Sequence, residues 1–162
     1  MIKKINYLFQ ALLIYIFFFI GRILGIKISK KIFSIIFFYL GPLFKSKEII
    51  KKNIKTFSQN ISSHEEEKII ENMWKNYGMT FIEYIFLDYY KKKKSHIIID
   101  GEDNLSNLIK ENRPVIFVSG HFANFELMSM EISKKGIPLA TIYRPLNNPF
   151  LNPLMEFMRK KF

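Results

Sequence analysis

The sequence predicts an α/β protein: an N-terminal membrane-anchoring helix and a helical segment, followed by a parallel βαβα core that is incomplete at its C-terminal end. Two observations predict this class. A long uncharged stretch lies near the N-terminus, and short runs rich in β-branched residues alternate with helical periodicity in the last third of the chain. We therefore divide the chain into a membrane anchor with its basic flank (1–31), a membrane-proximal helical region (32–94) and the N-terminal part of the α/β core (95–162).

The composition excludes several kinds of site. The 162 residues include no cysteine, which rules out disulfides, cysteine zinc sites and a thiol nucleophile. The formal net charge of +11 favours anionic partners, although a codon bias toward A and T would give the same mixture of Lys, Ile, Asn and Phe. The 17 Phe cluster in apolar runs instead of alternating with basic residues, so nucleic acid is not an expected partner.

The N-terminal apolar stretch has the length and flanks of a membrane-spanning helix. No charged residue occurs from Ile5 to Gly21, which is close to the shortest span that crosses a bilayer. Lys3 and Lys4 precede the stretch and more cations follow it, so the rest of the chain is expected on the cytoplasmic side. Residues 18–22 contain no small-residue cleavage site, which favours a retained anchor over a secretory signal.

Two further patterns predict helical structure before residue 95. The apolar run from Ile32 to Phe44 is interrupted by a Gly-Pro pair, so we expect it to lie in the membrane interface or to pack on the domain. Ser63 and Glu66 have the spacing of a capping box that opens a long helix. The run Lys91–Lys94 follows that helix and suits the negative end of its dipole.

The core is predicted from short apolar runs that alternate with helical segments. Strands are expected at 97–100, 114–119 and 138–143, and helices at 105–111, 125–134 and 153–161. Strands that alternate with helices form parallel sheets with right-handed crossovers, and ligands bind at the carboxyl edge of such sheets. We therefore expect the functional site at the ends of these strands.

A histidine and a carboxylate follow the second expected strand. Gly120 permits a sharp turn, so the imidazole of His121 is expected to project from the sheet edge. Positions five apart on a helix point about 140° away from each other, so His121 must precede the helix to meet Glu126. Glu126 would then orient one ring nitrogen while the other accepts a proton from the substrate, which makes His121 a general base.

The segment from Ser119 to Glu126 resembles the H-x-x-x-x-[DE] motif of the lysophospholipid acyltransferase superfamily. Within it, Gly-His-Phe-Ala-Asn-Phe-Glu is most similar to the lipid A biosynthesis (lauroyl or myristoyl) acyltransferases, whose pattern is near G-H-F-G-N-W-E. Ala123 and Phe125 depart from that pattern. The resemblance spans essentially the whole chain, including the apolar N-terminus and the segments at 76–78, 101–105 and 143–149. Because the family continues beyond Phe162, we expect this to be an N-terminal partial sequence.

The resemblance implies transfer of a fatty acyl group from an acyl carrier protein thioester to a hydroxyl of a lipid A precursor. The reaction would take place at the bacterial inner membrane, with the catalytic region facing the cytoplasm. The implied partners are membrane lipid, acyl carrier protein and the lipid A precursor, and the thioester donor takes the place of a cofactor. The resemblance assigns catalysis to His121 and Glu126. Arg144 is a candidate to bind an oxyanion or phosphate, and Asn124 and Asn148 are weaker substrate-binding candidates.

Alternative functions stay open at this point. A glycerolipid acyltransferase with a lysophosphatidate-like acceptor would use the same histidine motif, and a non-catalytic membrane protein would bind anionic lipid through a lysine-rich face. No metal site is expected, because His64 and His96 lie in neighbourhoods different from that of His121. Ser119 lacks the G-x-S-x-G elbow of a serine hydrolase. Lys91–Lys94 are a candidate docking surface for the acidic carrier protein.

Overall fold

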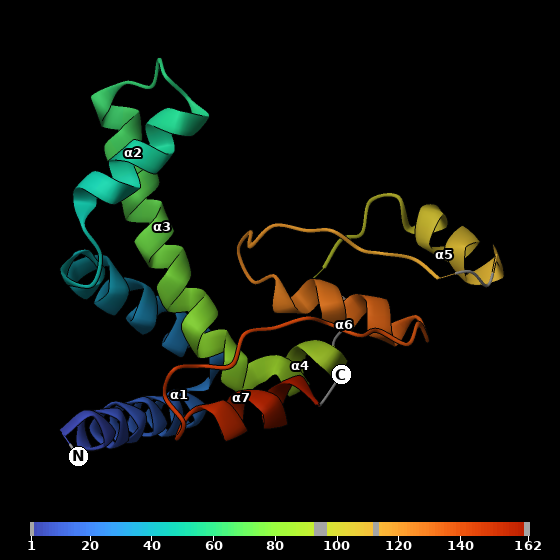
Figure 1. Ribbon diagram of the computed structural model, residues 1–162, viewed down its shortest axis with the longest axis horizontal. Helices are drawn as coiled ribbons and strands as arrows, with labels where there is room; N and C mark the ends of the chain where they lie inside the picture. The colour runs from blue at the N-terminus through green and yellow to red at the C-terminus, as the bar shows by residue number, and fades with distance from the viewer. Residues whose placement is uncertain (1, 93–96, 112–113, 161–162) are drawn as a thin grey trace. The chain divides into compact units, whose positions relative to one another are not determined.

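The computed structural model describes residues 2–92, 97–111 and 114–160, and the regular elements in these ranges are helices (Figure 1). In chain order they are α1 (Ile2–Leu40), η1 (Gly41–Leu43), α2 (Lys47–Phe57), α3 (Ser63–Glu83), η2 (Tyr84–Phe86), α4 (Leu87–Lys92), α5 (Glu102–Glu111), α6 (Glu126–Lys134) and α7 (Asn152–Arg159). The chain divides into two units. One comprises residues 12–86, and the other comprises residues 1–11 together with 87–162.

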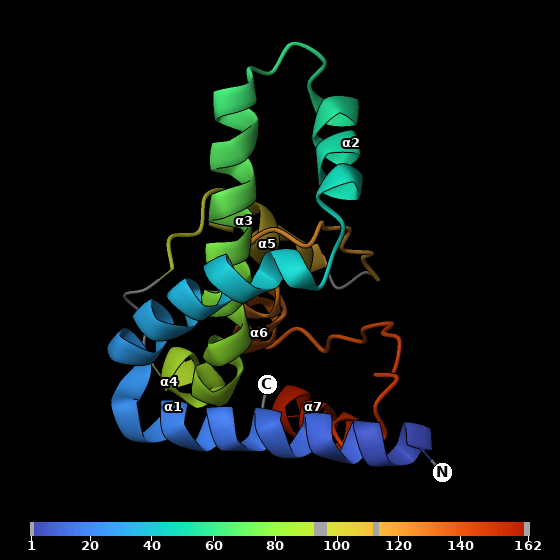
Figure 2. The ribbon, with the colours of Figure 1, turned by 90° about the vertical axis from the view of Figure 1, so that its left-hand side faces the viewer.

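Helix α1 is long, apolar and bent. It changes direction at Gly25, whose φ of 74° and ψ of 165° are not helical (Figure 2). Glycine tolerates a positive φ because it has no Cβ. Among the described residues, the stretch from Ile2 to Leu43 is the one that is long and apolar enough to cross a membrane. Many of its large apolar side chains face outward, so an apolar N-terminal helix of membrane-spanning length is confirmed.

Aromatic packing joins α3 to both arms of α1 within the unit of residues 12–86. The ring of Phe81 on α3 lies 5.0 Å from that of Phe18, which precedes the bend in α1. After the bend, the rings of Phe33 and Phe37 lie 5.8 Å and 5.3 Å from the same ring. The apolar run that begins at Ile32 therefore packs on the domain, one of the two outcomes expected from the sequence.

The long helix after residue 62 is confirmed, but its predicted cap is wrong by one residue. Ser62 is the N-cap: its Oγ accepts the N–H of Glu65 at 3.2 Å, and the Glu65 carboxylate accepts the Ser62 N–H at 3.1 Å. Glu66 points inward, where it is 3% exposed and lies 2.5 Å from Lys51 Nζ. This ion pair raises the pKa of Lys51 and draws Glu66 away from the capping role.

Gly78 allows α3 to approach α1 closely. A Cβ at this position would fall on the carbonyl oxygen of Phe33 and lie 2.9 Å from the Cβ of Phe37. Because part of the obstruction is backbone, Gly78→Ala must push the two helices apart, and we expect a loss of about 1–3 kcal/mol in the free energy of unfolding. Thermal unfolding in detergent measures this loss, with Asn72→Ala on the exposed face of α3 as the control. Equal stability of the two variants would contradict the close approach.

The predicted parallel βαβα core is wrong, and the α/β class with it. No strand or bridge occurs in residues 2–92, 97–111 or 114–160, although strands were expected at 97–100, 114–119 and 138–143. In the last two segments Ile116, Val118 and Ile142 are exposed instead of covered by neighbouring elements. A helix satisfies its backbone hydrogen bonds internally, whereas a strand needs a partner on its edge. The helices of this region are confirmed in α5, α6 and α7.

Candidate functional site

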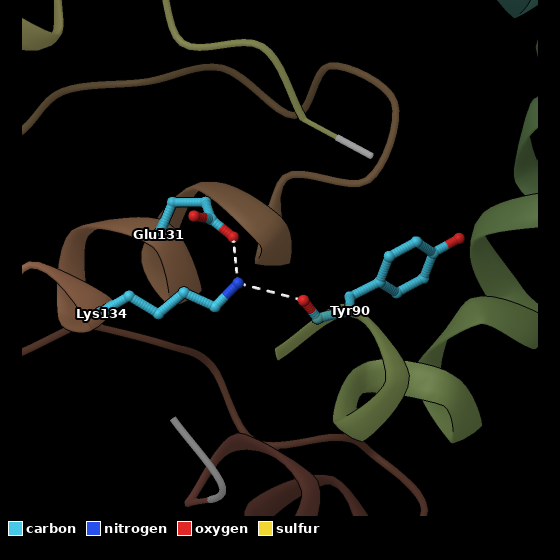
Figure 3. Close-up of polar contacts among 3 residues, drawn as sticks. All are labelled: Tyr90, Glu131 and Lys134. Carbon is cyan, nitrogen blue, oxygen red and sulfur yellow. Dashed lines mark hydrogen bonds and ion pairs between the residues drawn. The ribbon is translucent and has the colours of Figure 1, made fainter. Parts of the chain in front are cut away.

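Helix α6 carries Glu126 at its first position and is fixed to α4 near its last. Lys134 Nζ donates hydrogen bonds to the carbonyl oxygen of Tyr90 at 3.0 Å and to Glu131 Oε1 at 2.5 Å (Figure 3). A cation is favourable beside the last carbonyls of α4, because the C-terminal end of a helix is partially negative. Met130, in the middle of α6, is fully buried. Polar and apolar contacts together therefore fix the helix that carries the carboxylate.

His121 lies in a tight turn ahead of α6. The N–H of Phe122 donates to the carbonyl of Gly120 at 2.9 Å, which closes a three-residue turn centred on His121. A Cβ on Gly120 would meet the ring of Phe122 at 2.6 Å, so glycine suits this turn. The His121 ring packs edge to face against Phe125, with ring centroids 4.2 Å apart. His121 thus precedes the helix that begins at Glu126, as predicted.

Ala123 has a φ of 44°, in the region that favours glycine. The G-H-F-G-N-W-E pattern has Gly at the matching position, so the departure at Ala123 carries a backbone strain of about 1–2 kcal/mol. We expect Ala123→Gly to raise the free energy of unfolding by about 1 kcal/mol in chemical denaturation. Ala140→Gly is the matched control, because Ala123 is the one non-glycine residue with positive φ in the described ranges. A similar change in both variants would argue against strain at Ala123.

The carboxylate of Glu126 is buried and is held by Arg159 from α7. Glu126 is 5% exposed, and its Oε1 accepts hydrogen bonds from Arg159 Nε at 3.0 Å and Nη2 at 2.6 Å. A buried carboxylate without such a partner is strongly unfavourable. The same guanidinium lies 5.2 Å from the ring centroid of Tyr143. Sequence analysis did not identify Arg159, because 33 positions separate it from Glu126 and no local pattern links them.

Tyr143 gives this cluster a pH dependence. Its hydroxyl donates to Glu156 Oε1 at 3.1 Å, and this hydrogen bond is the main reason that the pKa of Tyr143 is raised above its ordinary 10.0. The protonated phenol is therefore favoured in the folded state, and its contribution to stability is present below about pH 10 and lost as pH rises through the folded pKa. We expect Tyr143→Phe to flatten the fall in unfolding temperature above about pH 10. The same slope as in the wild type would exclude this contribution.

The histidine, the carboxylate and two arginines line one cavity of about 1380 Å³. Its lining residues include His121, Glu126, Arg144 and Arg159. Arg144 is exposed, and its Nη2 lies 3.4 Å from Asn147 Oδ1. The cavity therefore combines an imidazole able to move a proton with cations able to bind an anion. Three of the predicted site residues line this cavity, and their catalytic and binding roles stay predictions.

The two predicted asparagines are not among the described residues that line this cavity. Asn148 is buried, donates from Nδ2 to the carbonyl of Tyr7 at 2.8 Å and accepts the N–H of Phe150 at 3.0 Å, so it shapes the loop before α7. The carbonyl of Asn124 accepts the N–H of Leu127 at 3.2 Å in the first turn of α6. Substrate binding by either asparagine stays a prediction.

The proposed carrier-docking lysines and the other two histidines are only partly described by the structure. Lys91 and Lys92 end α4, whereas Lys93, Lys94 and His96 lie outside the described residues. His64 is exposed at the start of α3. Within the ranges that the structure describes, no group of three or more His, Asp and Glu side chains is arranged to hold a metal ion.

The described residues thus form a helical protein with an N-terminal helix of membrane-spanning length. One of its cavities is lined by a histidine, a buried carboxylate and arginines. Residues 2–162 match the family model for bacterial lipid A biosynthesis acyltransferases, and the chain belongs to that family. The resemblance found in the sequence is thereby confirmed.

Two curated relatives extend this comparison. The chain is 28% identical over 123 residues to the lipid A biosynthesis palmitoleoyltransferase of Escherichia coli (strain K12), and equally so to the lipid A biosynthesis acyltransferase of Shigella flexneri. Each alignment covers 74% of this chain and 39% of the relative. The chain thus spans about two fifths of the length of the curated relatives it matches. No solved structure matches the chain.

Proposed function

We propose that this protein is a membrane-anchored acyltransferase that moves a fatty acyl group from an acyl carrier protein thioester to a hydroxyl of a lipid A precursor. The observation that carries the proposal is the shared cavity of His121, Glu126 and Arg144, in a chain that belongs to the lipid A acyltransferase family. The printed names of the two relatives, which concern lipid A biosynthesis, support the choice of acceptor.

His121 acts as the general base. It accepts the proton of the acceptor hydroxyl as the oxygen attacks the thioester carbonyl, so that a C–O bond forms and a tetrahedral oxyanion develops. Collapse of this intermediate breaks the C–S bond, and the imidazolium returns the proton to the departing thiolate. A positioned base is typically worth about 10²- to 10⁴-fold in rate. The exposed side chain of His121 at the cavity is accessible to such an acceptor.

Glu126 and Arg144 support the base in different ways. Glu126 orients the imidazole and stabilises its protonated form, through a contact that forms when the acceptor is bound. Arg144 stabilises the oxyanion or binds a phosphate of the acceptor. Asn124 and Asn148 remain secondary candidates for contacts with the substrate.

The walls of the cavity and the N-terminal helix suit a lipid reaction. Apolar side chains from the segments before and after the site in the chain line the cavity, among them Val115, Ile116, Leu139 and Ile142, and these provide a surface for an acyl chain. Helix α1 would hold the enzyme at the inner membrane, with the catalytic region on the cytoplasmic side. Lys91 and Lys92 are the described part of the basic run that we propose for carrier docking.

A transfer assay with three arms tests the proposal. The purified full-length protein receives a labelled acyl carrier protein thioester together with a lipid A precursor, a lysophosphatidate, or anionic vesicles alone. Transfer to the lipid A precursor is the expected result. Preference for lysophosphatidate would indicate a glycerolipid acyltransferase instead. Salt-sensitive binding to vesicles without transfer to either acceptor would indicate a non-catalytic lipid-binding protein.

A further inference from the structure

We infer that Arg159 is the positioning residue of the site: it holds the Glu126 carboxylate in place and so determines how Glu126 acts on His121. The inference rests on the proposed function and extends it to a residue on a helix that the catalytic motif does not include. Arg159 lies at the end of α7, and Glu126 begins α6. The contact between them therefore ties the two helices together at the cavity.

The geometry of the contact favours a positioning role. Arg159 Nε and Nη2 both donate to Glu126 Oε1, at 3.0 Å and 2.6 Å, so two charge-assisted hydrogen bonds from one guanidinium hold this oxygen in place. The side chain of Glu126 is 6% exposed, compared with 27% for Arg159, so the carboxylate that accepts these hydrogen bonds is largely shielded from water. A lysine supplies the same charge but only a point-like donor.

The guanidinium is itself held on a second side. It lies over the ring of Tyr143 at 5.2 Å, and the Tyr143 hydroxyl donates to Glu156 on the same helix as Arg159. Asn152 Nδ2 also donates to Glu156 Oε1 at 2.8 Å, and Asn152 Oδ1 accepts the N–H of Leu146 at 3.0 Å. Helix α7 thus holds the loop that carries Arg144 through Glu156 and Asn152. It holds Glu126 through Arg159.

Arg159 is distinguished from a substrate-binding cation by how its loss affects the reaction. A residue that acts through Glu126 affects the transition state, so its removal should lower kcat and leave KM for the acceptor nearly unchanged. Its effect should also disappear once Glu126 no longer carries a charge, because residues that act as one unit are not additive. An arginine that binds an acceptor phosphate would instead raise KM, and it would do so whether or not Glu126 is present.

The test compares Arg159→Met, Arg159→Lys, Glu126→Gln and the Glu126→Gln/Arg159→Met double variant in the full-length protein. The control is Lys160→Met, which removes an exposed cation from the adjacent position. We expect Arg159→Met to lower kcat roughly 10- to 100-fold, Arg159→Lys to lower it less, and Lys160→Met to leave it unchanged. Adding Arg159→Met to Glu126→Gln should cost less than about twofold. A loss mainly in KM, or multiplicative losses in the double variant, would overturn the inference.

A readout that needs no turnover separates this inference from the proposed function. The chain has three histidines, so the ring resonances of His121 are assigned in NMR spectra by their disappearance in His121→Ala. We expect Arg159→Met, or Arg159→Lys if the former fails to fold, to move these resonances, and to move them little when Glu126 is already Gln. If the wild type transfers no acyl group, the proposed function fails, and the His121 resonances alone then test whether Arg159 positions Glu126. His121 resonances that do not move when Arg159 is replaced would overturn the inference, even in an active enzyme.

Discussion

Acyl transfer is expected to fall by at least about 10²-fold when His121 is replaced by Ala, while folding and membrane association persist. The lost contribution should belong to the transition state, because in the proposed mechanism the imidazole removes the proton only as the acceptor oxygen attacks the thioester. His121 is exposed, and its ring contact is with Phe125, so the change removes little buried packing. Single-turnover kinetics with a saturating thioester measures the chemical step directly.

Glu126→Gln extends this experiment to the carboxylate. If Glu126 orients and polarises the imidazole, its loss should also be severe, and the double variant should be little worse than His121→Ala alone. Independent roles would give multiplicative losses. Such losses would leave His121 as the general base but would contradict its pairing with Glu126. His64→Ala, which removes an exposed histidine at the start of α3, is the matched control and should retain full activity. Near wild-type activity in His121→Ala would eliminate the mechanism.

The helices were predictable because their signals are local. Apolar residues at helical spacing identified α3, α6 and α7, and each helix forms its own backbone hydrogen bonds. The cap of α3 shows the limit of such signals, since Ser62 with Glu65 and Ser63 with Glu66 have the same capping-box spacing. The structure selects the first pair because Glu66 is buried against Lys51, a contact between helices that the spacing does not contain.

The sequence wrongly predicted strands, because strand formation depends on contacts that are not local. A run such as 114–119 has high strand propensity, but propensity becomes a strand only where a neighbouring chain segment supplies its hydrogen bonds. The site divides in the same way. The turn around His121 and its place ahead of α6 follow from adjacent residues, with Gly120 making the turn possible. The contact of Arg159 with Glu126 depends on how α6 and α7 pack, so only the structure identifies it.

Two lysines placed in the apolar helix are expected to release the protein from the membrane. Leu12 and Ile16 lie near the middle of the uncharged stretch and are 56% and 45% exposed, so their side chains are available to lipid. A lysine at the centre of a membrane-spanning helix costs about 2.5–3.5 kcal/mol. The Leu12→Lys/Ile16→Lys variant should therefore lose about 5–7 kcal/mol of insertion energy, or at least about three orders of magnitude in partitioning.

Extraction of membranes with alkaline carbonate measures this release. The wild type should stay in the pellet, because apolar insertion does not depend on salt or on lysine charge, whereas the double variant should move to the supernatant. Phe57→Lys is the control: Phe57 is 94% exposed on α2, so the change makes the same exchange of an exposed apolar side chain for lysine outside α1. Release of the wild type under these conditions would refute the anchor. Release of Phe57→Lys to the same extent as the double variant would show that added charge anywhere in the chain, and not its position in α1, causes the loss.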